Sequence, residues 1–449
     1  MAINQLPGVT INGNVNIAGD GNYISPKTVC VLAKVNSNTT PMTQQNQQFA
    51  LDAPDNLTVT LPDNASNISI TQSGTDIPST SNGATNWEVS GSSLTMYTGG
   101  VLKSGAVTVT YDLPDPQFWS PLAWYSSLAV DHYYGNQFNN NGSLNSALSL
   151  GAFYAFQGGA TAVIVQPWSE GGSCTLSDAL ANIQEMEGIN IVVPIGCSST
   201  ELQVVAQSLD GSNSSGYRRR AIFALDDPAS TPTTISTYTD LASDLNNYEI
   251  MLLGNSGAVT SSGQSVPPSM YACVLAGMAE FYQFNQTLTH KAVNGFILDK
   301  TYTTPQIAQL LAGSVAVVAS RGGGNRMIES VVTTQDRKLD FSFAGVDNYL
   351  ADSLSDYYSN YIGELATDTA IMGIQGSTQL FLEKQQQNDI IKSYSEVSVT
   401  QDSLDPTQID VAFTCTWLPP IYNIAVNYTF DSNTQAVQSN LSSSLIANS

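Results

Sequence analysis

The chain has 449 residues, with 14 Lys and Arg against 37 Asp and Glu and a formal net charge of −23 at pH 7. This charge argues against duplex nucleic acid as a direct ligand, because affinity for it depends on cationic side chains that meet phosphates. Hydrophobic residues make up 42% and charged residues only 11%, so we expect a folded chain of about two to four domains, whose uncharged polar surface suits burial against neutral partners.

The first segment predicts an extended N-terminal arm over residues 1–20. Apolar and polar residues alternate there, as in a strand with one apolar face. The apolar positions are Val9, Ile11, Val15 and Ile17. The apolar run "TVCVLAKV" (28–35) follows and predicts a buried strand.

Residues 45–114 predict an inserted β domain. The runs "LTVTLP", "NISITQSG", "NWEVSG", "SLTMYTG" and "AVTVTYD" are separated by Gly, Ser, Asn and Pro. Short strands at such close spacing are typical of a small antiparallel sandwich or barrel. The flanking ranges, 21–44 and 115–330, then form one α/β core domain.

Strand and helix patterns alternate through 115–330, which predicts a largely parallel sheet. The strands are "TAVIVQPW", "INIVVPIG", "RAIFALD", "YEIMLLGN" and "SVAVVAS". Among the helices, "TLSDALANIQEMEG" has Thr175 as N-cap and Gly188 as C-cap. In "TTPQIAQLLAG" we expect Thr304 as N-cap, ahead of a proline at the first helical position.

Residues 331–430 predict an α+β C-terminal domain. "VDNYLADSLSDYYSNYIG" and "STQLFLEKQQQNDIIKSY" have helical patterns, and "IYNIAVNYTF" is a final strand. Its apolar face comprises Tyr422, Ile424, Val426, Tyr428 and Phe430. We expect the polar tail, 431–449, to be disordered.

The stretch "SRGGGNRM" is the first candidate for chemistry. It lacks the Lys and Ser or Thr that a P-loop needs, and Met327 stands at the third glycine position of a dinucleotide-binding motif. The glycines therefore predict a tight turn with positive φ rather than a nucleotide site.

Other candidates for chemistry are isolated. His132 and His290 lie in no zinc-binding motif. For "RRR" (218–220) we favour a solvated or ion-paired strand start over an anion site, and for "DDP" (226–228) a turn over a metal-binding carboxylate pair. We predict no catalytic residue, cofactor or metal.

The sequence also predicts a product that is neither secreted nor inserted in a membrane. "MAINQLPGVT" lacks the features of a signal peptide, and no apolar run reaches the roughly 18 residues of a membrane span. The five cysteines show no CxxC motif, so we expect reduced, mostly buried thiols in the cytoplasm. They are Cys30, Cys174, Cys197, Cys273 and Cys415.

In the order of its segments the chain resembles contractile tail sheath proteins of bacteriophages. The likeness is carried by "PGV", "GAVTVTYDLPDP", "AVDHYYGNQFNNNGSLNSALSLGAFYAFQGGATAVIV" and "MLLGN", and then by the long stretch "VLAGMAEFYQFNQTLTHKAVNGFILDKTYTTPQIAQLLAGSVAVVASRGGGNRMIESVVTT". It continues through "YIGELATDTAI", "IIKSYSEVSV" and "PPIYNIAVNYTF". The likeness covers nearly the whole chain.

The resemblance implies a structural protein without active-site chemistry. Copies would form six-membered rings that stack as a helix around an inner tube, with baseplate and tail terminator proteins at the ends. The terminal strands would be exchanged between neighbours, and an extended, metastable state would contract and drive the tube forward. The resemblance also places a C-terminal helix against the tube, for which Lys384 and Lys392 are the candidate contacts. The location would be the virion tail, after assembly in the host cytoplasm.

Two other functional classes stay open at the level of sequence. An α/β enzyme would retain a nucleotide or metal on purification. A polar surface-layer or adhesin protein would need an export signal in its precursor. Within the sheath family, the sequence does not separate a phage tail from a bacteriocin-like or other injection device.

Overall fold

The computed structural model describes most of the chain outside the termini. The described residues are 28–35, 42–51, 56–61, 65–81, 84–90, 92–98, 101–115, 117–226, 235–334, 339–422, 424–432 and 435–443. The predicted N-terminal arm, 1–20, lies outside them. The chain divides into two compact units, one formed by 36–120 with 171–173 and the other by the remaining residues. Within the described residues, no helix has the length and apolar character needed to cross a bilayer.

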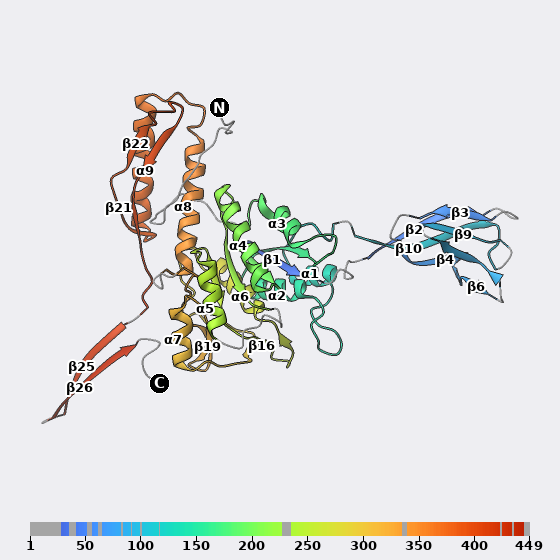
Figure 1. Ribbon diagram of the computed structural model, residues 1–449, viewed down its shortest axis with the longest axis horizontal. Helices are drawn as coiled ribbons and strands as arrows, with labels where there is room; N and C mark the ends of the chain where they lie inside the picture. The colour runs from blue at the N-terminus through green and yellow to red at the C-terminus, as the bar shows by residue number, and fades with distance from the viewer. Residues whose placement is uncertain are drawn as a thin grey trace. The chain divides into compact units, whose positions relative to one another are not determined.

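The larger unit is built on a six-stranded sheet in the order β11-β12-β1-β13-β14-β15. Figure 1 labels β1 of this sheet among the surrounding helices. The parallel strands of the sheet are β1 (Thr28–Lys34), β12 (Ala162–Trp168), β13 (Ile191–Ile195), β14 (Arg220–Ala224) and β15 (Ile250–Leu253). The edge strand β11 (Leu122–Trp124) is antiparallel. These strands are nearly continuous apolar runs, because helices cover a parallel sheet on both faces. The sequence predicted an α/β core with a largely parallel sheet; the α/β class and a partly parallel sheet are confirmed.

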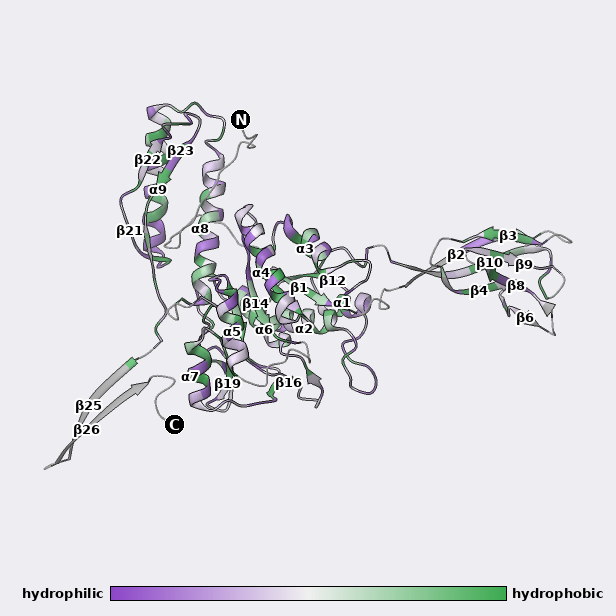
Figure 2. Ribbon diagram, viewed as in Figure 1, coloured by the Kyte–Doolittle hydropathy of each residue, from purple (hydrophilic) through white to green (hydrophobic). Residues whose placement is uncertain are grey.

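Helices connect and cover these strands. They are α1 (Ser127–Tyr134), α2 (Ala147–Gly158), α3 (Leu176–Gln184), α4 (Ser199–Ser214), α5 (Ile235–Leu245), α6 (Ser269–Phe281) and α7 (Thr304–Ala312). β1 and α6 are mainly hydrophobic (Figure 2). Helices α2 and α6 meet at glycines: a Cβ on Gly158 would lie 2.2 Å from the carbonyl oxygen of Val274, and one on Gly277 would lie 2.0 Å from that of Ala155. No larger residue fits at either position without moving the helices apart.

The predicted helix caps are correct to within a few residues. Thr175 caps α3 in a capping box with Asp178, as expected. The helix ends at Gln184, however, with Glu185 as its C-cap in place of the predicted Gly188. The N-cap of α7 is Thr303, one residue ahead of the predicted Thr304.

The smaller unit consists of antiparallel sheets. One has the order β2-β10-β4-β5 and another β3-β9-β8, and β6 pairs with β7. Their bounds are β2 (Met42–Leu51), β3 (Leu57–Thr60), β4 (Ser66–Gln72), β5 (Thr75–Ile77), β6 (Thr80–Ser81), β7 (Ala84–Thr85), β8 (Trp87–Ser90), β9 (Ser93–Met96) and β10 (Gly105–Pro114). Ile70 and Val107 from the four-stranded sheet share one hydrophobic cluster with Leu94 and Met96 from the three-stranded sheet, which is the arrangement of a sandwich.

The C-terminal part of the larger unit has a hydrophobic cluster of its own. It lies between α8 (Phe341–Ser359), α9 (Asp368–Gln387) and short strands, with Phe343, Leu350 and Leu382 among its members. The strands pair as β21 (Ile391–Tyr394) with β24 (Cys415–Trp417) and β22 (Ser398–Gln401) with β23 (Ile409–Ala412). The second predicted helix is therefore too long: its last residues, "IKSY", form β21.

The described chain ends in a hairpin of β25 (Ile424–Ser432) and β26 (Gln435–Ser443). The tail was expected to be disordered from residue 431, and this expectation is wrong for β26. "QAVQSNLSS" has too few apolar residues to indicate a strand by itself, and its pairing with β25 supplies the hydrogen bonds that sequence patterns do not reveal.

Candidate assembly surfaces

The Gly-rich stretch forms the turn of a hairpin between β19 (Val318–Arg321) and β20 (Gly324–Met327). Gly322 and Gly323 have φ of 60° and 84°, values that L side chains adopt rarely. Two successive residues with positive φ match the twist of an antiparallel hairpin. The predicted turn is confirmed, and it is followed directly by a strand rather than by a helix whose N-terminus could hold phosphate.

The three arginines at 218–220 are held inside the larger unit. Arg218 lies 3.9 Å from Asp352. Arg219 and Arg220 are each only 2% exposed; Arg219 donates to the carbonyl oxygens of Gln184 and Met186. Arg220 lies 3.7 Å from Glu280. Of the two alternatives in the prediction, a solvated or an ion-paired strand start, the ion-paired one is confirmed for Arg218 and Arg220.

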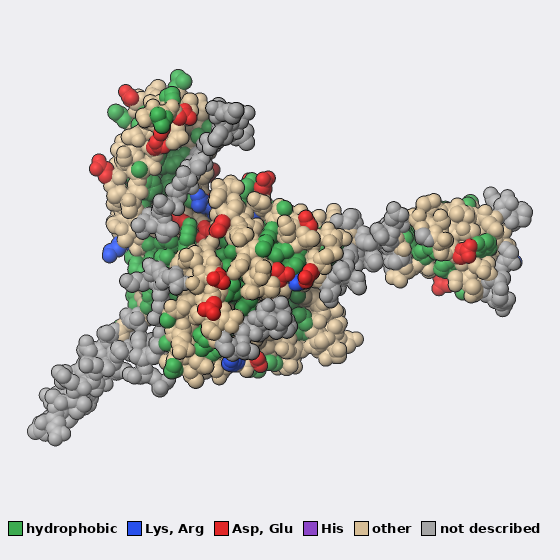
Figure 3. Space-filling view, viewed as in Figure 1, with side chains coloured by type: hydrophobic (Ala, Val, Ile, Leu, Met, Phe, Trp, Pro, Cys, Tyr) green, Lys and Arg blue, Asp and Glu red, His purple; other side chains and the backbone are tan. Residues whose placement is uncertain are grey.

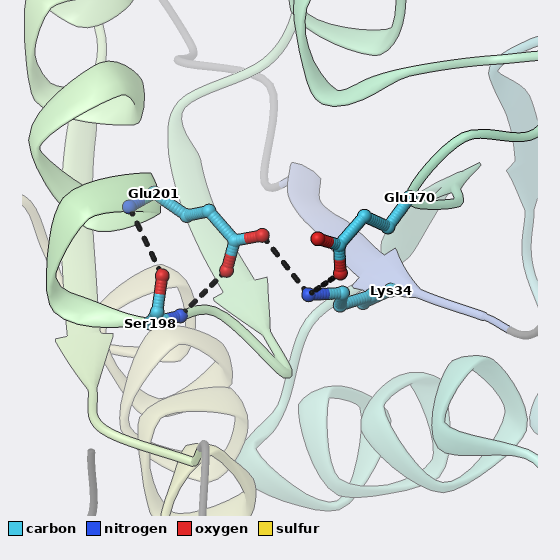
Figure 4. A network of polar contacts seen from close by, with 4 residues as sticks. All are labelled: Lys34, Glu170, Ser198 and Glu201. Atoms are coloured by element: carbon cyan, nitrogen blue, oxygen red, sulfur yellow. Dashed lines mark hydrogen bonds and ion pairs between the residues drawn. The ribbon is translucent and has the colours of Figure 1, made fainter. Parts of the chain in front are cut away.

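The carboxyl end of β1 is the position where a doubly wound sheet of this strand order ordinarily binds a ligand. Here Lys34 lies between the carboxylates of Glu170 and Glu201, with its Nζ 3.0 Å from an oxygen of each (Figure 4). Burial alone would lower the pKa of Lys34, but hydrogen bonds to Glu201 and Glu170 raise it. Glu201 also forms the capping box of α4 with Ser198. We interpret this network as a structural contact between β1, the segment that follows β12, and α4.

The remaining candidates for chemistry are Asp226, the two histidines and the five cysteines. Asp226 accepts hydrogen bonds from the backbone nitrogens of Gly196 and Ser269 (2.9 and 2.8 Å), and burial raises its pKa to about 6. His132 and His290 are exposed. Within the described part of the chain, no group of His, Cys, Asp and Glu has a geometry that could hold a metal ion. All five cysteines are free and buried, as predicted.

The C-terminal hairpin is the first candidate surface for assembly. Val426 pairs with Leu441 and Phe430 with Val437 across β25 and β26. Among the described residues the hairpin is a sheet of only two strands, so each strand has one edge without a backbone partner there. Such an edge is a template for pairing with another chain. Ile424, at the start of β25, is 60% exposed.

Tyr422 differs from the other residues of the predicted final strand, because β25 begins only at Ile424. It lies ahead of the strand and is partly buried. Its hydroxyl donates a hydrogen bond to Oδ2 of Asp340 (3.2 Å) within the same chain. Tyr422 therefore lies ahead of the strand to which the sequence pattern assigned it, and its part in strand exchange stays a prediction.

The exposed face of α9 is the second candidate surface. Met372, Gly376, Leu380 and Lys384 are all exposed and follow one another at intervals of four, so they form one row along the helix. We call this set the α9 row. Met372 and Leu380 are 70% and 67% exposed, and a Cβ on Gly376 would meet no described atom within 4 Å. From the sequence we predicted only Lys384 of this row as a contact residue, although the four-residue spacing of Met372, Leu380 and Lys384 along the helix can be read from the sequence.

Lys384 and Lys392 are both exposed, Lys384 in the last turn of α9 and Lys392 in β21. Neither has a carboxylate within 4 Å among the ion pairs of the described residues. Figure 3 shows that cations are sparse on the face in view and that uncharged polar groups dominate it. Among the described residues, the two lysines are thus cations without an ion-pair partner on the surface of a very acidic chain.

These features define a class of protein: an α/β protein with a Lys–Glu network at the carboxyl end of β1 and with strand edges and a helix face that are suited to contacts with other chains. No protein-family model matches the chain. A curated relative, the tail sheath protein of Mycobacterium phage Bxz1, is 23% identical over 355 residues. The match covers 75% of this chain and 60% of the relative, so the chain spans about 60% of the relative's length.

Solved structures of contractile assemblies share the fold. A chain in the cryo-EM structure of the anti-feeding prophage baseplate matches with a TM-score of 0.59 at 12% identity, over 96% of this chain and 100% of that one. The helical sheath of the anti-feeding prophage in its contracted state gives 0.57, at 12% identity and the same coverage. The contracted PVC sheath complex of an extracellular contractile injection system gives 0.58 at 12% identity, over 97% and 100%. The chain thus has the fold of contractile sheath proteins and a sequence relative named tail sheath protein.

Proposed function

We propose that this chain is a structural subunit of a contractile tail sheath. The observation that carries the proposal is the fold match over 96% of the chain to a sheath in its contracted state. Copies of the chain polymerise as stacked six-membered rings around an inner tube, between a baseplate and a tail terminator. The location is the tail of a virion or of a related injection particle, after assembly in the host cytoplasm.

Contraction in this proposal needs no active site. The extended sheath is metastable, and a trigger at the baseplate lets the rings twist and widen into a shorter state with more buried surface between subunits. The free energy comes from the difference between two packings of the same folded subunit, so no nucleotide is consumed. A contact that is heterologous and does not close produces a helix of subunits.

The terminal strands link the subunits while their cores rotate. The N-terminal arm with Val9, Ile11, Val15 and Ile17 pairs with a neighbour's sheet, and the β25–β26 hairpin offers the open edges described above. Main-chain ladders suit this role because they hold two chains together without fixing the angle between their cores. Ile424, Val426, Tyr428 and Phe430 are the apolar residues of the donated strand.

Helix α9 faces the inner tube in this proposal. The α9 row offers apolar contact through Met372 and Leu380, and Gly376 between them allows a tube helix or strand to approach the backbone closely. Lys384 and Lys392 then meet carboxylates of the tube at the edge of this contact.

Co-expression with the inner tube protein tests the proposal. Negative-stain microscopy should show tubes with a thick, helically striated coat, and the chain should sediment with them. Purification of the chain only as a dispersed monomer, in the presence of correctly formed tubes, would contradict the proposed function.

A further inference from the structure

The carboxylate of Asp340 joins three separate parts of the larger unit. Asp340 has no exposed surface. Its Oδ2 accepts hydrogen bonds from the hydroxyls of Ser330 (2.6 Å), Thr287 (2.7 Å) and Tyr422 (3.2 Å). Its Oδ1 caps the N-terminus of α8 by accepting from the backbone nitrogen of Ser342 (2.9 Å). One buried side chain thus connects loops of the α/β core, the start of α8 and the residue that precedes the C-terminal hairpin.

The segment that leads to the hairpin is held at both ends by the start of α8. We call residues 417–422 the arm base. At its first residue, the ring of Trp417 meets the ring of Phe343 edge-to-face, with centroids 5.4 Å apart. At its last residue, Tyr422 bonds to Asp340. Pro419 and Pro420 lie between these two contacts, and consecutive prolines restrict a chain to a stiff, extended conformation.

Tyr422 is partly buried although its described neighbours are exposed. Ile421 and Ile424, the described residues on either side of it, are 80% and 60% exposed. Burial raises the pKa of the Tyr422 hydroxyl well above its ordinary value, which keeps it protonated and able to donate to Asp340. At 3.2 Å between the two oxygens this is a long hydrogen bond, since O–H···O distances are typically about 2.7–2.8 Å, and its role is to fix the direction of the Tyr422 side chain.

We propose that the contact between Tyr422 and Asp340, together with the stiff arm base, sets the direction in which the β25–β26 hairpin leaves the subunit. The inference rests on the proposed function, because it assigns Tyr422 the role of a positioning residue for strand exchange. A hairpin held in one direction presents its open edge to the neighbour at a higher effective concentration than a freely swinging one. Ordering it in advance also lowers the entropic cost of assembly.

The variant Tyr422→Phe tests the proposal by removing one hydroxyl. Spin labels at Thr429→Cys and Thr400→Cys report the distance between the hairpin and the C-terminal part, and the native cysteines are buried. We expect the unassembled variant to fold with a broadened distance distribution. From the loss of one hydrogen bond, assembly on tubes should require a roughly three- to tenfold higher subunit concentration. Pro419→Gly with Pro420→Gly, which leaves the hydrogen bond in place, should broaden the distribution in the same way.

Tyr248→Phe is the matched control. The hydroxyl of Tyr248 also donates to an aspartate of α8, Asp347, at 2.9 Å. Phenylalanine keeps the ring that meets Phe343 edge-to-face with centroids 6.0 Å apart, so the control removes only a hydroxyl that bonds to Asp347 and not to Asp340. The control should keep the wild-type distance distribution. The proposal is overturned if Tyr422→Phe leaves both the distribution and assembly unchanged, or if Tyr248→Phe changes them equally. If wild-type chain forms no sheath at all, the proposed function fails, whereas the distance measurement still decides the role of Tyr422.

Discussion

At the scale of single residues, Glu249 and Asp352 are acids whose pKa values lie near neutrality. Glu249 is 4% exposed, and burial raises its pKa to about 8, with a further increase from nearby Asp347. Burial likewise raises the pKa of Asp352 to about 7, although Arg218 opposes the shift. In the unfolded chain both groups ionise near pH 4. The folded state therefore binds more protons between roughly pH 4 and 8, and its stability falls as pH rises through that window.

We predict that the melting temperature of the subunit increases when the pH is lowered from 8 to 5. Glu249→Gln should flatten this dependence, because glutamine cannot ionise and its side-chain oxygen can still accept from Asn213, the partner of Glu249. Calorimetric scans at several pH values measure the effect, with Glu396→Gln, at an exposed position, as the control. A wild-type melting temperature that falls steadily between pH 8 and 5 would show that these acids do not govern the stability.

Single residues also show where sequence analysis reaches its limit. The turn at Gly322 and Gly323 was predictable, because consecutive glycines between a strand and a polar run leave few other conformations. The burial of Arg219 was not predictable from the sequence. Its hydrogen-bond acceptors are the carbonyl oxygens of Gln184 and Met186, which lie more than thirty residues away in the chain. A run of three arginines looks solvated until the fold brings distant partners to it.

At the scale of elements, buried strands were the most predictable feature. A run such as "IVVPI" in β13 is apolar throughout, because both faces of the strand are covered. Strands with few apolar residues were missed, since their stability comes from pairing: β21 was included in a helix and β26 in a disordered tail. The apolar residues of the α9 row were not predicted as a contact surface, because only the charged residue of the row, Lys384, stood out in a chain with few cations.

For α9 we predict that Leu380→Asp weakens binding to the inner tube by at least about tenfold, because it places a charge in an apolar contact. Charge reversal at Lys384 and Lys392 should weaken binding mainly at low ionic strength, where exposed charges are least screened. Co-sedimentation with tubes measures both. Val204→Asp is the control, since Val204 is also an exposed apolar residue on a helix, at 40%. Wild-type binding by Leu380→Asp would exclude the α9 row from the tube contact.

For the N-terminal arm we predict that Val15→Asp with Ile17→Asp abolishes polymers and leaves a folded monomer. The α/β core keeps its own hydrophobic contacts, whereas the interface would have to bury two charges. Deletion of residues 1–20 should have the same effect, through loss of a ladder whose hydrogen bonds contribute about 0.5–1.5 kcal/mol each. Circular dichroism and analytical ultracentrifugation separate folding from assembly. Long polymers from either variant would remove the N-terminal arm from the mechanism.

At the scale of the whole molecule, the smaller unit is an insertion between two strands of the central sheet. β1 and β11 lie on either side of β12, and Lys34 and Leu122 are in register with Trp168 and Val165 of that strand. The two ends to be joined are thus about two strand spacings apart across the sheet and three residues apart along it, a separation of roughly 14 Å. The smaller unit also has its own hydrophobic cluster, so the larger unit does not need it to complete its core.

We therefore predict that a Gly-Ser linker of about six residues, which can span this distance, can replace residues 36–120. The shortened chain should remain soluble, keep the thermal transition of the larger unit and still assemble on tubes. Size-exclusion chromatography and calorimetry measure the first two properties. Aggregation of the shortened chain would mean that the insertion is required for folding.

A helical cryo-EM reconstruction of the assembled polymer, before and after contraction, tests the central claim most directly. The account predicts rings of six subunits around the tube, with the N-terminal arm and the β25–β26 hairpin paired to neighbouring chains in both states. The subunit fold should stay the same while the spacing between rings shortens. Terminal strands that pair only within their own chain, or a polymer of fixed length under every trigger, would contradict it.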